Sequence, residues 1–144
     1  EAEKKFNATY KELDDLLKES DFVVLMTPLT ASTEGMLGAR EFSLMKESAI
    51  FINGSRGKTI VEKDLIQALQ QKEIKAAGLD VFEQEPVQKD NPLLDMPNVV
   101  TLPHIGSATY ATEHAMSELA CENLLAGLRG EKPSCLINEA VWKD

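Results

Sequence analysis

Cysteine is scarce in this sequence, and several other features that mark particular protein classes are missing from it. The chain of 144 residues has two cysteines, Cys121 and Cys135, whose spacing fits neither a CxxC motif nor a metal-binding cluster. We therefore expect no disulfide framework and no metal site, and a reducing cytoplasm as the setting. No apolar run approaches the roughly 20 residues that span a bilayer, and no secretory signal pattern opens the chain, so no membrane partner is expected.

Positive charge is also in short supply. The 15 lysines and arginines are outnumbered by 24 acidic residues, which gives a net charge of -9 and argues against a nucleic-acid partner. Two sequence motifs are absent as well. Without G-x-S-x-G there is no signal for a serine nucleophile, and without G-x-G-x-x-G the usual cradle for a dinucleotide pyrophosphate is missing.

Short apolar runs alternate with segments of helical spacing along the chain. The predicted strands cover residues 22–26, 49–53, 76–81 and 99–102, and the predicted helices cover 13–18, 39–45, 61–69 and 109–128. This order is typical of parallel strands joined by right-handed crossovers. We expect an α/β fold that consists of half of a doubly wound Rossmann-type parallel sheet, followed by a long C-terminal helix.

Local patterns add detail to this architecture. Thr9 followed by Glu12 predicts a capping box for the first helix. The unbroken apolar run at 22–26 predicts a strand that is buried on both faces. Gly54 and Gly57 predict a turn whose backbone adopts conformations that other residues resist. The leucines and Met of the last helix predict contacts with a core or with another subunit.

Titratable side chains follow three successive strands of the predicted sheet. Arg56 follows the second strand, Asp80 and Glu85 lie at and beyond the end of the third, and His104 follows the fourth. Parallel strands end at the same edge of a sheet, and open α/β sheets bind their ligands there. We therefore expect an arginine, a carboxylate and an imidazole to lie close together at this edge.

Such a set suits a proton-coupled change at a carbonyl beside a carboxylate. An arginine can hold the carboxylate and polarise the neighbouring oxygen, and a histidine can give or take the proton. A carboxylate bonded to the second ring nitrogen orients an imidazole and favours its protonated form. Each residue also has an ordinary interpretation. Arg56 or Glu85 can be solvated loop residues, Asp80 a helix cap, and His104 a hydrogen-bonded structural histidine.

Four motifs, in order and at matching spacing, resemble the D-isomer-specific 2-hydroxyacid dehydrogenases. They are TPLT at 27–30, FINGSRG at 51–57, AGLDVFEQEP at 77–86 and PHIGSAT at 103–109, and the likeness runs from about Leu13 to the end. Within the family, HIGSAT and the segment NLLAGLRG at 123–130 are most similar to the glyoxylate/hydroxypyruvate reductase and 2-ketogluconate reductase group.

The resemblance implies a role for each matching residue. Arg56 would bind a 2-oxo acid, His104 would protonate the developing alkoxide as a hydride arrives from the nicotinamide, and Glu85 would be the partner carboxylate. Asp80 would hold the nicotinamide carboxamide. The residues implied to contact the cofactor, largely through backbone atoms, are Pro28, Gly54, Ser55, Asp80 and Gly106. The cofactor is NAD or NADP, with NADP favoured by the group.

The chain departs from the family because the substrate domain and the glycine-rich first half of the cofactor domain are absent. We therefore interpret residues 1–108 as the C-terminal half of a dinucleotide-binding domain, and residues 109–144 as a helix and tail leading back toward the substrate domain. The resemblance implies a homodimeric parent enzyme that reduces a small 2-oxo acid, and the piece alone is expected to be inactive.

Two other interpretations stay open. A member of the same family can bind a dinucleotide as a sensor or corepressor without catalysis. An unrelated α/β binding module can carry the same strand-end residues incidentally.

Overall fold

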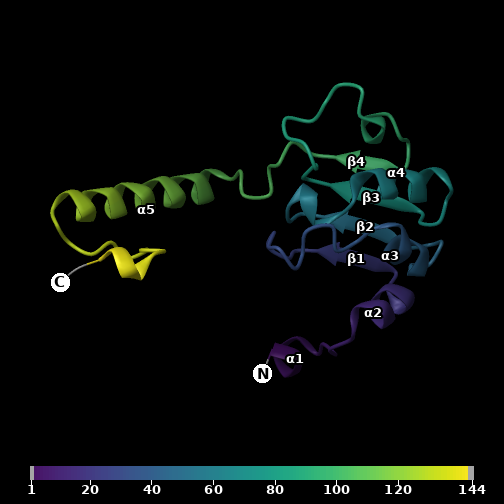
Figure 1. The fold of residues 1–144 in the computed structure, drawn as a ribbon, viewed down its shortest axis with the longest axis horizontal. Coiled ribbons are helices and arrows are strands. Elements are labelled where there is room, and N and C mark those ends of the chain that lie inside the picture. Colours follow the sequence, from purple (N-terminus) through teal and green to yellow (C-terminus); the bar gives the residue numbers. More distant parts are fainter. Residues whose placement is uncertain (1, 143–144) are drawn as a thin grey trace. The chain divides into compact units, whose positions relative to one another are not determined.

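The structure, a computed structural model, describes residues 2–142 and forms two compact units, residues 2–105 and 106–142. The first unit contains a sheet of four parallel strands in the order β1-β2-β3-β4 (Figure 1). The strands are β1 (Phe22–Leu25), β2 (Ile50–Asn53), β3 (Ala76–Leu79) and β4 (Val99–Thr101). Its helices are α1 (Ala2–Phe6), α2 (Leu13–Glu19), α3 (Ala39–Leu44) and α4 (Glu62–Gln70), with short 3-10 turns η1 (Gly57–Thr59) and η2 (Pro92–Leu94). The predicted α/β class and parallel sheet are confirmed.

Hydrogen bonds between neighbouring chain segments continue for one residue beyond the carboxyl ends of the strands. Gly54 N–H donates to the carbonyl of Leu25 at 3.3 Å, and Asp80 N–H donates to that of Asn53 at 3.0 Å. Leu102 N–H then donates to Leu79 at 2.8 Å. Each turn therefore leaves the sheet at the same edge as its neighbour, which is what brings their side chains together.

One face of the sheet packs against α2, α3 and α4 to form the core. Val23, Phe51 and Leu79 point into it from the strands, and Leu17 and Leu65 point into it from the helices. Phe51 meets Phe42 of α3 edge to face, with ring centroids 5.5 Å apart and planes at 79°. This geometry is the one that aromatic quadrupoles favour.

The other face of the sheet is open, contrary to the prediction of burial on both faces. Phe22 and Val24 of β1 are 63% and 56% exposed, and Val100 of β4 is 66% exposed. The side chains along β1 therefore alternate between exposed and buried. The reason is that the buried residues of α2, α3 and α4 all belong to a single core on one side of the sheet.

The first helices differ from expectation in two ways. The predicted capping box is wrong, because α2 begins at Leu13 with Glu12 as its N-cap and Thr9 lies outside it. The Glu12 carboxylate instead accepts a hydrogen bond from the hydroxyl of Tyr10 at 3.0 Å. Helix α1 was not predicted, since the polar residues 1–8 carry no periodic apolar signal.

The second unit contains the predicted long helix, α5 (Tyr110–Leu128), and a short 3-10 turn, η3 (Glu139–Val141). The Thr109 hydroxyl caps α5 by accepting from Thr112 N–H at 3.2 Å. No residue of α5 is buried, and apolar side chains such as Leu124 and Leu128 are exposed. The predicted core or subunit contacts of this helix stay a prediction. Within residues 2–142, no helix is long and apolar enough to cross a membrane.

Candidate functional site

The turn after β2 carries Arg56 at the edge of the sheet. Arg56 is the residue that precedes η1, and its backbone is extended, with φ -141° and ψ 142°. Its guanidinium Nη1 donates a hydrogen bond to the carbonyl of Ser55 at 2.7 Å. Arg56 is an exposed residue, so its positive charge is accessible from solvent.

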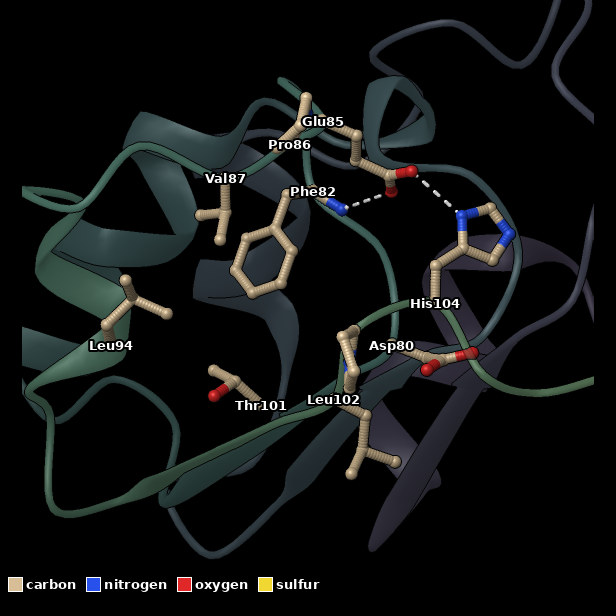
Figure 2. A pocket seen from close by; sticks show the side chains of 10 residues that line it. Asp80, Phe82, Glu85, Pro86, Val87, Leu94, Thr101, Leu102 and His104 are labelled. Carbon is tan, nitrogen blue, oxygen red and sulfur yellow. Dashed lines mark hydrogen bonds and ion pairs between the residues drawn. The ribbon is translucent and has the colours of Figure 1, made fainter. Parts of the chain in front are cut away.

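The loop after β3 brings Glu85 to His104. One carboxylate oxygen of Glu85, Oε1, accepts a hydrogen bond from the backbone N–H of Phe82 at 3.0 Å. The other, Oε2, lies 2.8 Å from His104 Nδ1 (Figure 2). An ionised carboxylate can only accept hydrogen bonds, so this contact places a proton on Nδ1. Nε2 is therefore the ring atom that can exchange a proton with a ligand.

The backbone of His104 is held in an uncommon conformation. Its φ is 55°, in the left-handed region, which histidine visits more often than most residues other than glycine. The next peptide group is fixed by Asp80, whose Oδ1 accepts from Ile105 N–H at 2.8 Å. Asp80 thereby ties the end of β3 to the turn that follows β4 and determines where the imidazole can reach.

The pKa of the Glu85 carboxyl group is held below its ordinary value of 4.5. The main cause is the hydrogen bond from His104; the Phe82 N–H and the charges of His104 and Arg56 act in the same direction, and burial opposes them. Glu85 and His104 are thus in direct contact, and the catalytic roles of these two residues and of Arg56 stay predictions.

The depressed pKa of Glu85 makes the stability of the fold depend on pH. A carboxyl group of this kind contributes stability above its unfolded-state pKa, and the contribution is lost as the pH falls through the folded-state value. We expect Glu85→Gln to lower the free energy of unfolding by less than about 1 kcal/mol at neutral pH, since the pair is partly exposed. The difference from wild type should shrink as the pH falls below 4.5 and vanish once the pH is below the depressed folded-state pKa of Glu85, measured by urea unfolding across a pH series.

Glu122→Gln, an exposed position on α5, is the matched control. A difference between Glu85→Gln and wild type that stays constant down to acidic pH would contradict the ionic interpretation of the Glu85–His104 pair.

Gly57 allows the turn of Arg56 to touch the loop of Glu85. A Cβ placed on Gly57 would lie 1.8 Å from the carbonyl oxygen of Phe82 and 2.4 Å from the amide nitrogen of Glu83. Neither Gly54 nor Gly57 has a positive φ, so the predicted reason for these glycines is wrong. At Gly57 the requirement is for close approach of two backbones.

A pocket of about 610 Å³ lies beside the Glu85–His104 pair. Figure 2 shows the side chains of Phe82, Val87 and Leu94 facing into it, so much of its wall is apolar. Its lining consists of Asp80, Phe82, Glu85, Pro86, Val87, Leu94, Thr101, Leu102, Pro103 and His104. Among residues 2–142, no group of three or more histidine, cysteine or acidic side chains is placed to hold a metal ion.

All but one of the residues predicted to contact a cofactor lie in the first unit, in turns that follow its strands. Pro28 follows β1 and is exposed, with its carbonyl accepting from the Thr33 hydroxyl at 2.6 Å. Gly54 and Ser55 form the turn after β2, although Ser55 is buried. Gly106 belongs to the second unit, so its position relative to the others is not defined. Their contacts with a cofactor stay predictions.

Sequence reasoning missed the buried polar residues behind the turn. Thr59 and Asn53 are both fully buried, yet neither was singled out. A signal was present, because a polar residue that ends an apolar strand needs a hydrogen-bond partner inside the protein. The hydrogen bond from Ile105 N–H to the Asp80 carboxylate had no such signal in the sequence.

Comparison with protein families gives a match over residues 1–106. The matching family is described as D-isomer specific 2-hydroxyacid dehydrogenase, NAD binding domain. Glyoxylate/hydroxypyruvate reductase B of Escherichia fergusonii is 55% identical over 143 residues, which are 99% of this chain and 44% of that protein. The chain therefore spans less than half the length of this relative.

Solved structures of the same kind are also similar. The D-lactate dehydrogenase of Lactobacillus jensenii, solved with NAD+, is 34% identical with a TM-score of 0.84, over 96% of this chain and 46% of that one. The NADPH-dependent glyoxylate/hydroxypyruvate reductase of Sinorhizobium meliloti, solved with NADP and malonate, is 39% identical with a TM-score of 0.78. That match covers 84% of this chain and 38% of the other.

Proposed function

Because this chain belongs to the family of D-isomer specific 2-hydroxyacid dehydrogenases, we propose that it carries the acid–base half of a 2-oxo acid reductase. The reaction is the NAD(P)H-dependent reduction of a small 2-oxo acid to the D-2-hydroxy acid. Glyoxylate, hydroxypyruvate and 2-ketogluconate are the candidate substrates, and the names of the relatives favour the first two. The observation that carries the proposal is the Glu85–His104 contact at 2.8 Å.

In this reaction His104 donates a proton from Nε2 to the carbonyl oxygen of the substrate. Glu85 keeps the ring oriented through Nδ1, so that Nε2 is the atom that delivers the proton. Arg56 binds the substrate carboxylate and polarises the adjacent carbonyl. One 2-oxo acid, one hydride and one proton give one 2-hydroxy acid, and His104 is reprotonated from solvent.

The residues at this edge fit the nicotinamide end of a dinucleotide. When bound, the reduced nicotinamide supplies the hydride. The Asp80 carboxylate, whose Oδ1 accepts from Ile105 N–H beside His104, would hold the carboxamide of the nicotinamide. Pro28, Gly54, Ser55 and Gly106 would line the cofactor, largely through backbone atoms.

The relatives are more than twice as long as this chain, and we propose that their remaining residues provide the other half of the cofactor site and the substrate domain. We assign residues 1–108 to the C-terminal half of the dinucleotide-binding domain, and residues 109–144 to a connection toward a substrate domain. The glycine-rich pyrophosphate cradle is absent from the 144 residues, so they are not expected to turn over substrate alone. The complete enzyme is proposed to be a cytoplasmic homodimer.

A graft tests this function directly. In the grafted enzyme, this chain replaces the matching 143 residues of the Escherichia fergusonii relative. We expect it to oxidise NADPH or NADH when hydroxypyruvate or glyoxylate is added, while the 144-residue chain alone shows no turnover. Arg56→Gln should raise KM for the 2-oxo acid by about 10- to 100-fold, because a charged hydrogen-bond donor to the substrate is lost.

Arg129→Gln, at the end of α5, is the control and should leave both kinetic constants unchanged. An inactive graft that still binds the dinucleotide would favour a sensor over a catalyst. Steady turnover by the 144-residue chain alone would contradict the proposed division of the cofactor site.

A further inference from the structure

Three polar side chains are buried directly behind the turn that carries Arg56. Asn53 and Thr59 have no exposed surface, and Ser55 is 6% exposed. Burying polar groups is costly unless each of them is hydrogen-bonded. All three are bonded, and the bonds lead to Arg56 from two directions.

The first direction is through the backbone of Arg56. Its carbonyl oxygen accepts from the Thr59 hydroxyl at 2.6 Å, from Thr59 N–H at 3.2 Å and from Asn53 Nδ2 at 3.3 Å. Three donors on a single carbonyl fix the plane of the peptide group that follows Arg56. The position of the Arg56 Cα, from which the side chain extends, is therefore fixed.

The second direction is through Ser55 to the guanidinium. Asn53 Oδ1 accepts both the N–H of Ser55 at 3.0 Å and its hydroxyl at 2.8 Å. With its donors held in this way, Ser55 presents its carbonyl to Arg56 Nη1 at 2.7 Å. One buried amide side chain thus controls both ends of the arginine.

The same residue connects this turn to the opposite side of the site. The backbone carbonyl of Asn53 accepts from Asp80 N–H at 3.0 Å, and the Asp80 carboxylate accepts from Ile105 N–H, next to His104. A continuous series of hydrogen bonds therefore runs from the arginine to the turn of the histidine.

We propose that Asn53 and Thr59 are positioning residues, which hold Arg56 in the orientation that receives the substrate carboxylate. The inference rests on the proposed function of Arg56. A long exposed arginine loses conformational freedom when it binds a ligand, and a preorganised one loses less. Neither residue touches the substrate, and both act through the backbone and the guanidinium of Arg56.

Thr59→Val in the grafted enzyme removes the hydroxyl and keeps the shape of the side chain. We expect KM for the 2-oxo acid to rise about three- to tenfold, from the loss of one buried hydrogen bond, with kcat and KM for NAD(P)H nearly unchanged. Thr59→Ser restores a hydroxyl and should return KM to the wild-type value. Steady-state kinetics with each substrate varied in turn measures this split.

Ser43→Ala is the matched control. The Ser43 hydroxyl donates to the carbonyl of Arg40 at 2.7 Å, over the same three-residue spacing as Thr59 and Arg56. Ser43 lies on α3 and not in the turns that carry Arg56, Glu85 and His104, so the loss of its hydroxyl should leave the kinetics unchanged. Equal KM values for Thr59→Val, Ser43→Ala and wild type would overturn the proposal.

Two further results separate this inference from the proposed function. If the wild-type graft is inactive, the proposed function fails, and positioning is then measured on the 144-residue chain by the NMR signal of the Arg56 guanidinium Nη1–H group, which donates to Ser55. That signal should move toward the position of an exposed arginine in Thr59→Val and not in Thr59→Ser. An unmoved signal overturns the inference. Failure of Thr59→Val and Thr59→Ala to fold would also overturn it, because the hydroxyl would then serve the whole fold.

Discussion

Replacing Gly57 with alanine is expected to lower the free energy of unfolding by about 3 kcal/mol and to abolish reductase activity in the grafted enzyme. The new Cβ would lie 1.8 Å from the carbonyl oxygen and 1.9 Å from the carbonyl carbon of Phe82. Both are backbone atoms, which cannot rotate away as the end of a side chain can. The two segments must separate, and this moves Arg56 away from Glu85. Urea unfolding of the 144-residue chain and turnover by the graft measure the two effects.

Gly78→Ala is the matched control for this change. A Cβ on Gly78 of β3 would lie 3.7 Å from Ile52 Cγ1, which is an ordinary van der Waals contact. We expect its unfolding free energy to stay within about 1 kcal/mol of wild type. Unfolding of Gly57→Ala and Gly78→Ala at the same urea concentration would show that the fold does not require the close approach of Gly57 to the Phe82 backbone.

The second large effect is expected from His104→Gln in the grafted enzyme. Glutamine can keep a hydrogen bond to Glu85 but cannot deliver a proton near neutral pH. We expect kcat to fall about 10²- to 10⁴-fold, which is the usual contribution of a general acid. KM for NAD(P)H should change little, because His104 is not among the residues proposed to contact the cofactor. Single-turnover absorbance of NAD(P)H measures the chemical step.

The sequence contains one other histidine, His114, which serves as the control. It lies on α5 with 80% of its side chain exposed, 3.8 Å from Glu118. His114→Gln should leave kcat unchanged. If His104→Gln and His114→Gln have equal rates, another group supplies the proton and the proposed mechanism is wrong.

The fold was predictable because its signals are local. Apolar runs such as 50–53 have strand length, and the spacing of Leu65 and Leu69 places both on the buried side of α4. Their order along the chain then determines parallel pairing. The exposure of the second face of β1 was not predictable in this way. Apolarity shows that a side chain can be buried, and it does not show which segment covers it.

The site was predictable to the level of strand ends. The contact between Glu85 and His104, beside the turn that carries Arg56, follows from parallel strands that end at one edge. The close approach at Gly57 and the network around Asn53 were not predictable. They depend on distances of a few tenths of an ångström between segments that are remote in sequence, and no periodic pattern encodes such distances.

The open face of the sheet and the net charge of the chain have opposite effects on self-association. Exposed Phe22, Val24 and Val100 favour self-association in water, as contiguous apolar surface does. The net charge of -9 keeps copies apart by mutual repulsion. The repulsion is screened by salt, over about 8 Å at physiological ionic strength and about 3 Å at 1 M, whereas the apolar attraction is not. Ionic strength therefore decides whether the chain stays dispersed.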